Sequence, residues 1–233
     1  MRFIEPGTPS NLELVPSLAV MGPTPVWVKD ERYNPVRIGG ESIGVVGLVN
    51  GLSERFGAVH YIDILGIRRG VVDWEIFRAS VERCDNIWAD MGVIFSDGLI
   101  DVVMAGAQEV VITTKMIDSL EEIVSSFELT ENLILQIDYD GSIVSRDRNI
   151  RKMGPGEFAE EMVSFGMDTF ILDDIREGRE AVDMRFLDRV LNSMPQDGKL
   201  YVGIEDLGEM EELSDMGVSG AIVSCSKLLE EIG

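Results

Sequence analysis

The feature that most constrains the fold of this chain is a regular alternation of short apolar runs with amphipathic stretches, repeated from end to end. The apolar runs that we predict as strands are Leu14–Val20, Ala58–Asp63, Asn86–Asp90, Glu109–Thr113, Leu133–Asp138, Thr169–Asp173, Lys199–Gly203 and Gly220–Ser224. They are nearly continuous in hydrophobicity, which is typical of parallel strands covered on both faces. Eight strand–helix units in 233 residues predict an α/β protein with a (β/α)8 TIM-barrel fold, and a doubly wound open sheet is the alternative.

An internal repeat favours the barrel over the open sheet, because a ring of eight units can arise by duplication of four. Three pairs of landmark residues share one separation of 111 positions (174 − 63, 203 − 92 and 217 − 106): Asp63 and Asp174, Gly92 and Gly203, Gly106 and Gly217. The sequence therefore predicts two half-barrel repeats. They form a single domain over residues 1–233, with a short N-terminal extension at 1–11.

The composition restricts the partners of the chain. It contains 42 Asp and Glu against 20 Lys and Arg, a net charge of −22, which argues against binding to nucleic acid or to an anionic membrane surface. Its two cysteines, Cys84 and Cys225, form no disulfide framework, and neither a signal peptide nor a membrane span is evident. We therefore predict a cytoplasmic protein and leave homo-oligomer formation open.

Carboxylates end several of the predicted strands. In parallel barrels the reactive groups come from the C-terminal ends of the strands and from the loops that follow. The strand-end residues of this kind are Asp63, Asp90, Asp138, Asp173 and Asp174. A partly buried carboxylate can acquire a pKa suited to proton transfer, so we select Asp138, Asp173 and Asp63 as candidate catalytic residues. The alternative for each is a cap on the following turn or helix.

Cations gather in loops after the strands, among them Arg146 after the fifth and Arg176 after the sixth. A planar guanidinium favours phosphate or carboxylate, so the predicted ligand is a small anionic metabolite, with phosphorylation as the first expectation. The alternative is that these arginines pair with neighbouring acids on a solvated surface.

His60 lies three residues before Asp63 in the same strand, so in a regular strand their side chains point to opposite faces. It could contact substrate or be a hydrogen-bonded core residue. Gly92 and Gly203 follow strands at equivalent points, where backbone amides could hold phosphate, or where a turn simply needs glycine.

Metal chemistry is a weaker alternative. Oxygen ligands from Asp90, Asp138, Asp173 and Asp174 would suit a hard divalent cation, but residues from separate strands make no recognised motif. The sequence predicts no metal and no cofactor.

Three segments together resemble the HisA/HisF family of histidine-biosynthesis barrels: Val59–Asp63 its second strand, Ile137–Val144 its fifth, and Leu172–Gly178 its sixth. The resemblance spans roughly residues 14–230. It implies a (β/α)8 fold and a ribose-phosphate-like ligand lying across the rim. In the isomerase branch of that family, aspartates on the first and fifth strands convert an aminoaldose into an aminoketose.

The departures from the family pattern are concentrated in the site. Asp138 matches the fifth-strand aspartate, but Ala19 stands where the first-strand aspartate is expected. The residues that replace the family's sixth-strand threonine and its small phosphate-binding turns are Asp173, Asp90, Gly92, Gly203, Thr113, Thr114, Ser224 and Cys225. Our candidate substrate-binding residues are the residues of this list except Asp173, together with His60, Arg146, Asp174 and Arg176. An acidic Asp90 would repel a phosphate placed beside it.

Two hypotheses follow. The first is a diverged HisA-like enzyme, of aldose–ketose isomerase or lyase type, that acts on a small anionic metabolite and not on the authentic histidine-pathway substrate. The second is a non-catalytic ligand-binding or assembly protein that kept the barrel and lost the reaction. Convergence of Asp63, Asp138 and Asp173 on one pocket would favour the enzyme, whereas scattered or salt-bridged carboxylates would favour binding alone.

Overall fold

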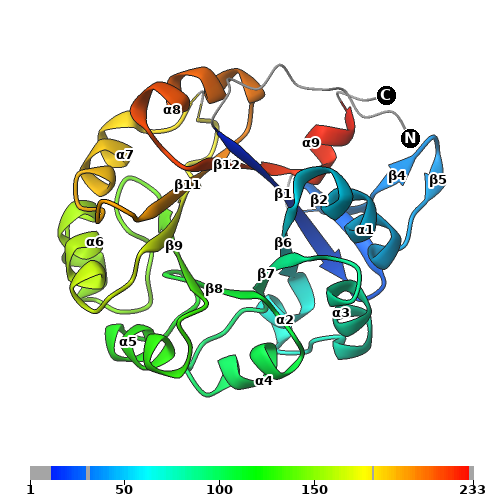
Figure 1. Cartoon of the computed structure of the whole chain (residues 1–233), viewed down its shortest axis with the longest axis horizontal. Helices are drawn as coiled ribbons and strands as arrows, with labels where there is room; N and C mark the ends of the chain where they lie inside the picture. Colours follow the sequence, from blue (N-terminus) through cyan, green and yellow to red (C-terminus); the bar gives the residue numbers. More distant parts are fainter. Residues whose placement is uncertain (1–11, 30–31, 180, 231–233) are drawn as a thin grey trace.

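A computed structural model describes residues 12–29, 32–179 and 181–230, so the predicted extension at 1–11 lies outside the described residues. Eight parallel strands form a closed ring, in which the last strand pairs back with the first (Figure 1). The ring consists of β1 Glu13–Met21, β6 Ala58–Asp63, β7 Asn86–Asp90, β8 Glu109–Thr113, β9 Leu133–Tyr139, β10 Thr169–Asp174, β11 Lys199–Ile204 and β12 Gly220–Ser224. This closure confirms the TIM barrel and excludes the open sheet.

Helices surround the ring on the outside (Figure 1). They are α1 Val45–Phe56, α2 Ile64–Arg69, α3 Trp74–Val81, α4 Gly98–Met104, α5 Leu120–Leu129, α6 Pro155–Ser164, α7 Met184–Leu191, α8 Met210–Met216 and α9 Cys225–Glu230, with 3-10 turns η1 Ile150–Lys152 and η2 Leu207–Glu209. The amphipathic pattern of the sequence predicts a helix over Glu41–Phe56, but α1 begins only at Val45. Gly39 and Gly40 take positive φ angles of 59° and 83°, which turns Glu41 and Ser42 into a hairpin strand instead.

The segment between β1 and α1 forms an antiparallel extension that the sequence pattern did not predict. It contains β2 Thr24–Lys29, β3 Arg32–Pro35, β4 Arg37–Ile38 and β5 Glu41–Ser42. The strand β12 pairs with β1 only as far as Ser17, and β2 then pairs with residues 19–21 of β1. The extension therefore protects backbone groups that the closing seam of the barrel leaves unpaired.

Two apolar cores hold the barrel. The larger one lies between the strands and the helices, and contains Val59, Tyr61, Leu48 and Phe77. The smaller one takes one residue from every strand of the ring and none from a helix: Val15, Ala58, Trp88, Val111, Ile134, Ile171, Tyr201 and Ile222. Since side chains alternate along a strand, this second set faces the inside of the ring. We call it the apolar plug.

Aromatic packing fixes the plug. The rings of Trp88 and Tyr201 meet edge to face with centroids 4.7 Å apart, and both side chains are almost completely buried. The plug is therefore a packed floor inside the barrel and not a channel.

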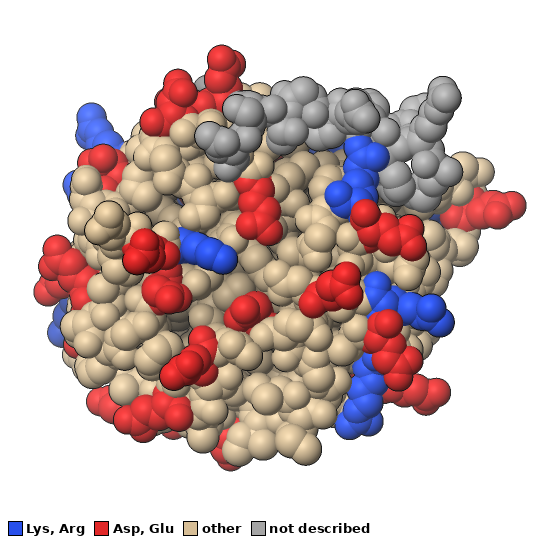
Figure 2. Space-filling model, in the orientation of Figure 1, with Lys and Arg blue, Asp and Glu red and all other residues tan. Residues whose placement is uncertain are grey.

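The charge of the chain is carried by its surface. One face of the molecule shows acidic side chains in several groups and fewer basic ones (Figure 2). No helix among the described residues is long and apolar enough to cross a membrane.

Gly92 tests how tightly the barrel packs. It has a φ of 71°, and a Cβ atom there would lie 2.5 Å from Ile67 Cα, on the backbone of α2. Gly57 has a similar φ of 79° but open space around it, which makes it a matched control. We expect Gly57→Ala to lower the free energy of unfolding by about 1 kcal/mol, and Gly92→Ala by about 1–3 kcal/mol more. Urea denaturation measures both, and equal losses would contradict the close packing.

Candidate functional site

A ring of polar residues lies directly above the apolar plug, toward the C-terminal ends of the strands. Two positions along a strand bring the side chain back to the same face, so the residue two places after each plug residue also points inward. These residues are Ser17, His60, Asp90, Thr113, Gln136, Asp173, Gly203 and Ser224. All of them except Gly203 carry a polar side chain, and six were predicted as site residues. The C-terminal end of the barrel therefore has a polar lining over an apolar floor.

Asp138 lies two residues beyond Gln136 on β9 and is completely buried. Its Oδ2 accepts hydrogen bonds from the Lys115 backbone amide at 3.0 Å and from Thr114 Oγ1 at 3.3 Å. Its Oδ1 accepts one from Gln136 Nε2 at 2.9 Å, and Lys115 Nζ is 3.9 Å away. Burial raises the pKa of Asp138, while the Lys115 ammonium and these hydrogen bonds oppose the rise.

Gln136 joins Asp138 to Asp173. The same Nε2 atom that donates to Asp138 also lies 3.3 Å from Asp173 Oδ2, so one amide bridges two carboxylates on neighbouring strands. Burial, followed by the charge of Asp138, raises the pKa of Asp173 to about 6. Gly203 makes room for this group, since a Cβ atom at that position would lie 2.9 Å from Asp173 Oδ1.

Asp90 is the third carboxylate of this cluster. Its side chain is buried, and Oδ1 accepts a hydrogen bond from the Gly92 amide at 3.0 Å. Burial raises the pKa of Asp90 to about 7, against the Gly92 hydrogen bond, and the charges of Asp138 and Asp63 add to the rise. Asp90 and Asp173 thus hold protons that ordinary carboxyl groups would release near pH 4.

His60 is buried in the same inward-facing ring as Asp90 and Asp173. Neither ring nitrogen has a hydrogen-bond partner among the residues that the structure describes. Burial lowers the pKa of His60 to about 4, which leaves a neutral imidazole at physiological pH. A buried polar group without a hydrogen-bond partner is rare in folded proteins.

Two of the predicted carboxylates support local structure instead. Asp63 Oδ1 accepts from the Leu65 and Gly66 amides at 2.9 and 2.8 Å and so caps α2. Asp174 is paired with Arg176, with an Nε to Oδ1 distance of 2.9 Å and an Nη2 to Oδ2 distance of 2.6 Å. Each of the two lies next to an inward-facing residue of its strand, so its side chain points away from the inside of the ring. The structure therefore joins Asp138 to Asp173 and turns Asp63 to the helix.

The remaining predicted residues differ in their placement. Thr114 contacts Asp138, whereas Thr113 Oγ1 accepts from the Met116 amide. Arg146 is exposed on the loop after β9. Ser224 is exposed with its hydroxyl 2.7 Å from that of Ser226, and the Cys225 thiol is buried with its pKa raised to about 12.

Sequence reasoning missed Lys115 and Gln136. A signal for Gln136 was present, because it lies two residues before Asp138 and so shares its face of the strand. Lys115 lies in the turn after β8, where the alternation along a strand gives no such signal. Within the described part of the chain, no three His, Cys, Asp or Glu side chains form a group that could hold a metal ion.

Comparison with known families identifies the barrel. Residues 45–231 match the model of a family described as histidine biosynthesis protein. The chain belongs to this histidine-biosynthesis family. The match confirms the resemblance noted in the strand-end motifs, and it covers every strand of the ring except β1. A search of curated proteins found no match. Membership in the histidine-biosynthesis family therefore establishes a HisA/HisF-like barrel.

The Asp90 carboxyl should make stability depend on pH. The unfolded chain releases this proton near 3.8 and the folded chain near 7, so between these values the folded state binds more protons and stability falls as pH rises. Asp90→Asn removes this penalty. We expect it to raise the free energy of unfolding relative to wild type at pH 8 more than at pH 5, by on the order of a few kcal/mol.

Denaturation of both proteins at the two pH values measures this difference. The exposed Asp140→Asn serves as the matched control. An Asp90→Asn effect that is the same at pH 5 and pH 8 would contradict the raised pKa.

Proposed function

We propose that this chain is an acid–base enzyme of isomerase type that acts on a small anionic, sugar-like metabolite. The observation that carries the proposal is the Gln136 amide between Asp138 and Asp173. It couples two carboxyl groups with raised pKa values at the C-terminal end of the barrel. Two carboxyl groups in this state can share the removal and return of one proton near neutral pH.

The roles of the two groups follow from their exposure. Asp138 is completely buried, whereas Asp173 keeps part of its surface open. Asp173 is therefore the group placed to meet a ligand, with Asp138 behind it. In an aldose–ketose isomerisation, a base takes the proton from the carbon beside the carbonyl and returns it to the former carbonyl carbon. A second proton moves from the hydroxyl oxygen to the carbonyl oxygen, so atoms and charge balance.

The arrangement differs from the isomerase branch of the family, and this supports a diverged reaction. Ala19 carries no carboxylate on the first strand. In its place Asp173 supplies a second carboxylate from β10, directly paired in register with Asp138 of β9. We infer that the acid–base pair has moved from strands one and five to strands five and six of the ring. A substrate other than that of the histidine pathway is consistent with this move.

Binding without catalysis is the second candidate. Asp138 has no exposed surface, and both of its oxygens accept hydrogen bonds, as in a carboxylate that serves structure. A barrel built this way could hold a ligand and transform nothing. Measurement of proton exchange separates the two functions.

Solvent exchange tests the enzyme. In deuterium oxide, we expect the protein to exchange the proton beside the carbonyl in at least one small aldose that carries a phosphate or a carboxylate. Asp138→Asn and Asp173→Asn should each lower this rate about 100-fold or more, because each removes one proton carrier. Nuclear magnetic resonance of the sugar measures the exchange.

Asp168→Asn is the matched control, since Asp168 is exposed at the opposite end of β10 and should leave the rate unchanged. Circular dichroism checks that each variant is folded. Exchange unaffected by Asp138→Asn would remove this residue from the mechanism, and no exchange with any aldose would favour binding alone.

A further inference from the structure

Lys115 is a charged side chain at the C-terminal end of the barrel to which the proposed proton transfer gives no role. It lies in the turn after β8, between the buried residues Thr114 and Met116. The Lys115 side chain is 48% exposed, whereas that of Asp138 beside it is not exposed at all. Lys115 is therefore the residue of this turn that a ligand entering the barrel can contact.

The backbone of this turn is fixed to β9. The Thr114 amide donates a hydrogen bond to the Gln136 carbonyl at 2.9 Å, and Thr114 Oγ1 accepts one from the Asp138 amide at 3.0 Å. The Lys115 amide donates to Asp138 Oδ2 at 3.0 Å. These three bonds hold the main chain of Lys115 next to Asp138, so only the side chain has to adjust to a ligand.

The ammonium group of Lys115 has unused donors. Nζ lies 3.9 Å from Asp138 Oδ1, which is too long for a hydrogen bond, and it makes no hydrogen bond to any residue that the structure describes. An ammonium group carries three N–H donors. A ligand oxygen at this end of the barrel can therefore accept one of them without breaking a hydrogen bond within the described chain.

The charge of Lys115 acts on all three buried carboxyl groups of the site. Burial raises the pKa values of Asp90, Asp138 and Asp173, and the Lys115 charge opposes the rise in each of them. The three groups come from different strands, β7, β9 and β10. The ammonium group thus faces the whole cluster and not one member of it.

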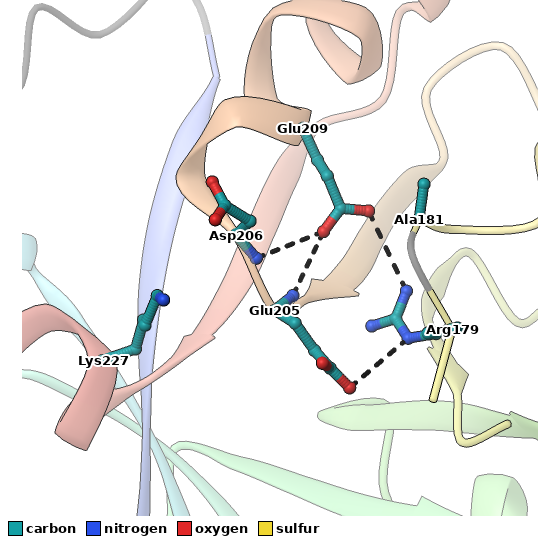
Figure 3. A pocket seen from close by; sticks show the side chains of 6 residues that line it. All are labelled: Arg179, Ala181, Glu205, Asp206, Glu209 and Lys227. Carbon is teal, nitrogen blue, oxygen red and sulfur yellow. Dashed lines mark hydrogen bonds and ion pairs between the residues drawn. The ribbon is translucent and has the colours of Figure 1, made fainter. Parts of the chain in front are cut away.

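Arg179 is a second cation close to this cluster, since its charge also opposes the rise that burial causes in the pKa of Asp173. Its side chain, however, is only 4% exposed, and it is paired with Glu205 and Glu209 at 3.7 and 3.9 Å (Figure 3). Glu209 Oε1 accepts in turn from the amides of Glu205 and of the residue that follows it, both at 3.2 Å. Carboxylates of the protein therefore enclose Arg179, and Lys115 is the more accessible cation.

We propose that Lys115 is a catalytic residue, whose ammonium group binds the carbonyl oxygen of the substrate and stabilises the negative charge that develops there. The proposal rests on the proposed function and specifies how the substrate is oriented. Lys115 follows β8, and Asp138 and Asp173 belong to the next two strands of the ring, β9 and β10. A substrate that lies across these strands has its carbonyl oxygen at Lys115 and the adjacent carbon at Asp173.

The electrons and charges of this step balance. When Asp173 takes the proton from carbon, the electron pair of the broken C–H bond forms a carbon–carbon double bond, and the π pair of the carbonyl group moves to its oxygen. The enediolate that results carries one negative charge, which a hydrogen bond from the Lys115 ammonium group stabilises without transfer of its proton. Return of a proton from Asp173 to carbon restores a carbonyl group.

Exchange of the carbon-bound proton in deuterium oxide tests the proposal, with erythrose 4-phosphate, ribose 5-phosphate and glucuronate as the probes. We expect Lys115→Gln to lower kcat for exchange about 100-fold, which is typical when one donor to a developing oxyanion is removed. KM should change little, because the contact strengthens only as the charge develops. Lys115→Arg keeps a cationic donor and should restore part of the rate.

The pH dependence of the exchange separates this role from a purely electrostatic one. If Lys115 served only to lower the pKa values of the three carboxyl groups, its loss would leave more of them protonated, and the rate of Lys115→Gln would recover at high pH. We expect the loss of rate to persist from pH 6 to pH 9. A loss that disappears by pH 9, or a rate equal to that of the wild type, would overturn the proposal.

Lys199→Gln is the matched control, because Lys199 is exposed at the start of β11, at the opposite end of the barrel. Urea denaturation checks that each variant is folded.

The same assay separates this proposal from the proposed function. Wild-type exchange by Lys115→Gln would remove Lys115 from the mechanism and leave the acid–base pair in place. Loss of exchange in Lys115→Gln, with full exchange in Asp138→Asn and Asp173→Asn, would contradict the pair and support Lys115. A wild-type protein that exchanges none of the probes would contradict both.

Discussion

The candidate site depends on the burial of three carboxyl groups inside a ring of parallel strands. Asp90, Asp138 and Asp173 lie above a floor of apolar side chains, in a setting where ionised groups are poorly solvated. Each group is held by hydrogen bonds that prevent it from turning away to solvent. The result is a set of carboxyl groups with raised pKa values, and the energy for that rise comes from the packing of the whole barrel.

Much of the fold could be predicted from the sequence, because continuous apolar strands between turn residues are a local signal. All eight strands of the ring were predicted to within one residue of their observed ends. The extension β2–β5 was not, because β3, β4 and β5 are short and largely polar and each of the four strands depends on an antiparallel partner. The helix α2 was missed for a related reason: it has only six residues and follows β6 without a loop.

The site was harder to predict, because position at a strand end does not say which way a side chain points. The direction follows from how many positions separate a side chain from a known inward-facing one, because an even number gives the same face. Asp90 and Asp173 lie two residues beyond Trp88 and Ile171 of the plug and face inward, whereas Asp63, five beyond Ala58, faces α2. Without the plug, the sequence offers no origin from which to count. The contacts of Glu209 with amides of its own loop depend on η2 and could not be read from spacing at all.

The apolar plug closes the barrel below the ring of polar side chains. A ligand of that ring can therefore enter and leave only by the C-terminal end. For the proposed enzyme, substrate and product would share this one path. Accumulated product would then compete directly with incoming substrate, and the rate of turnover would depend on how quickly product leaves.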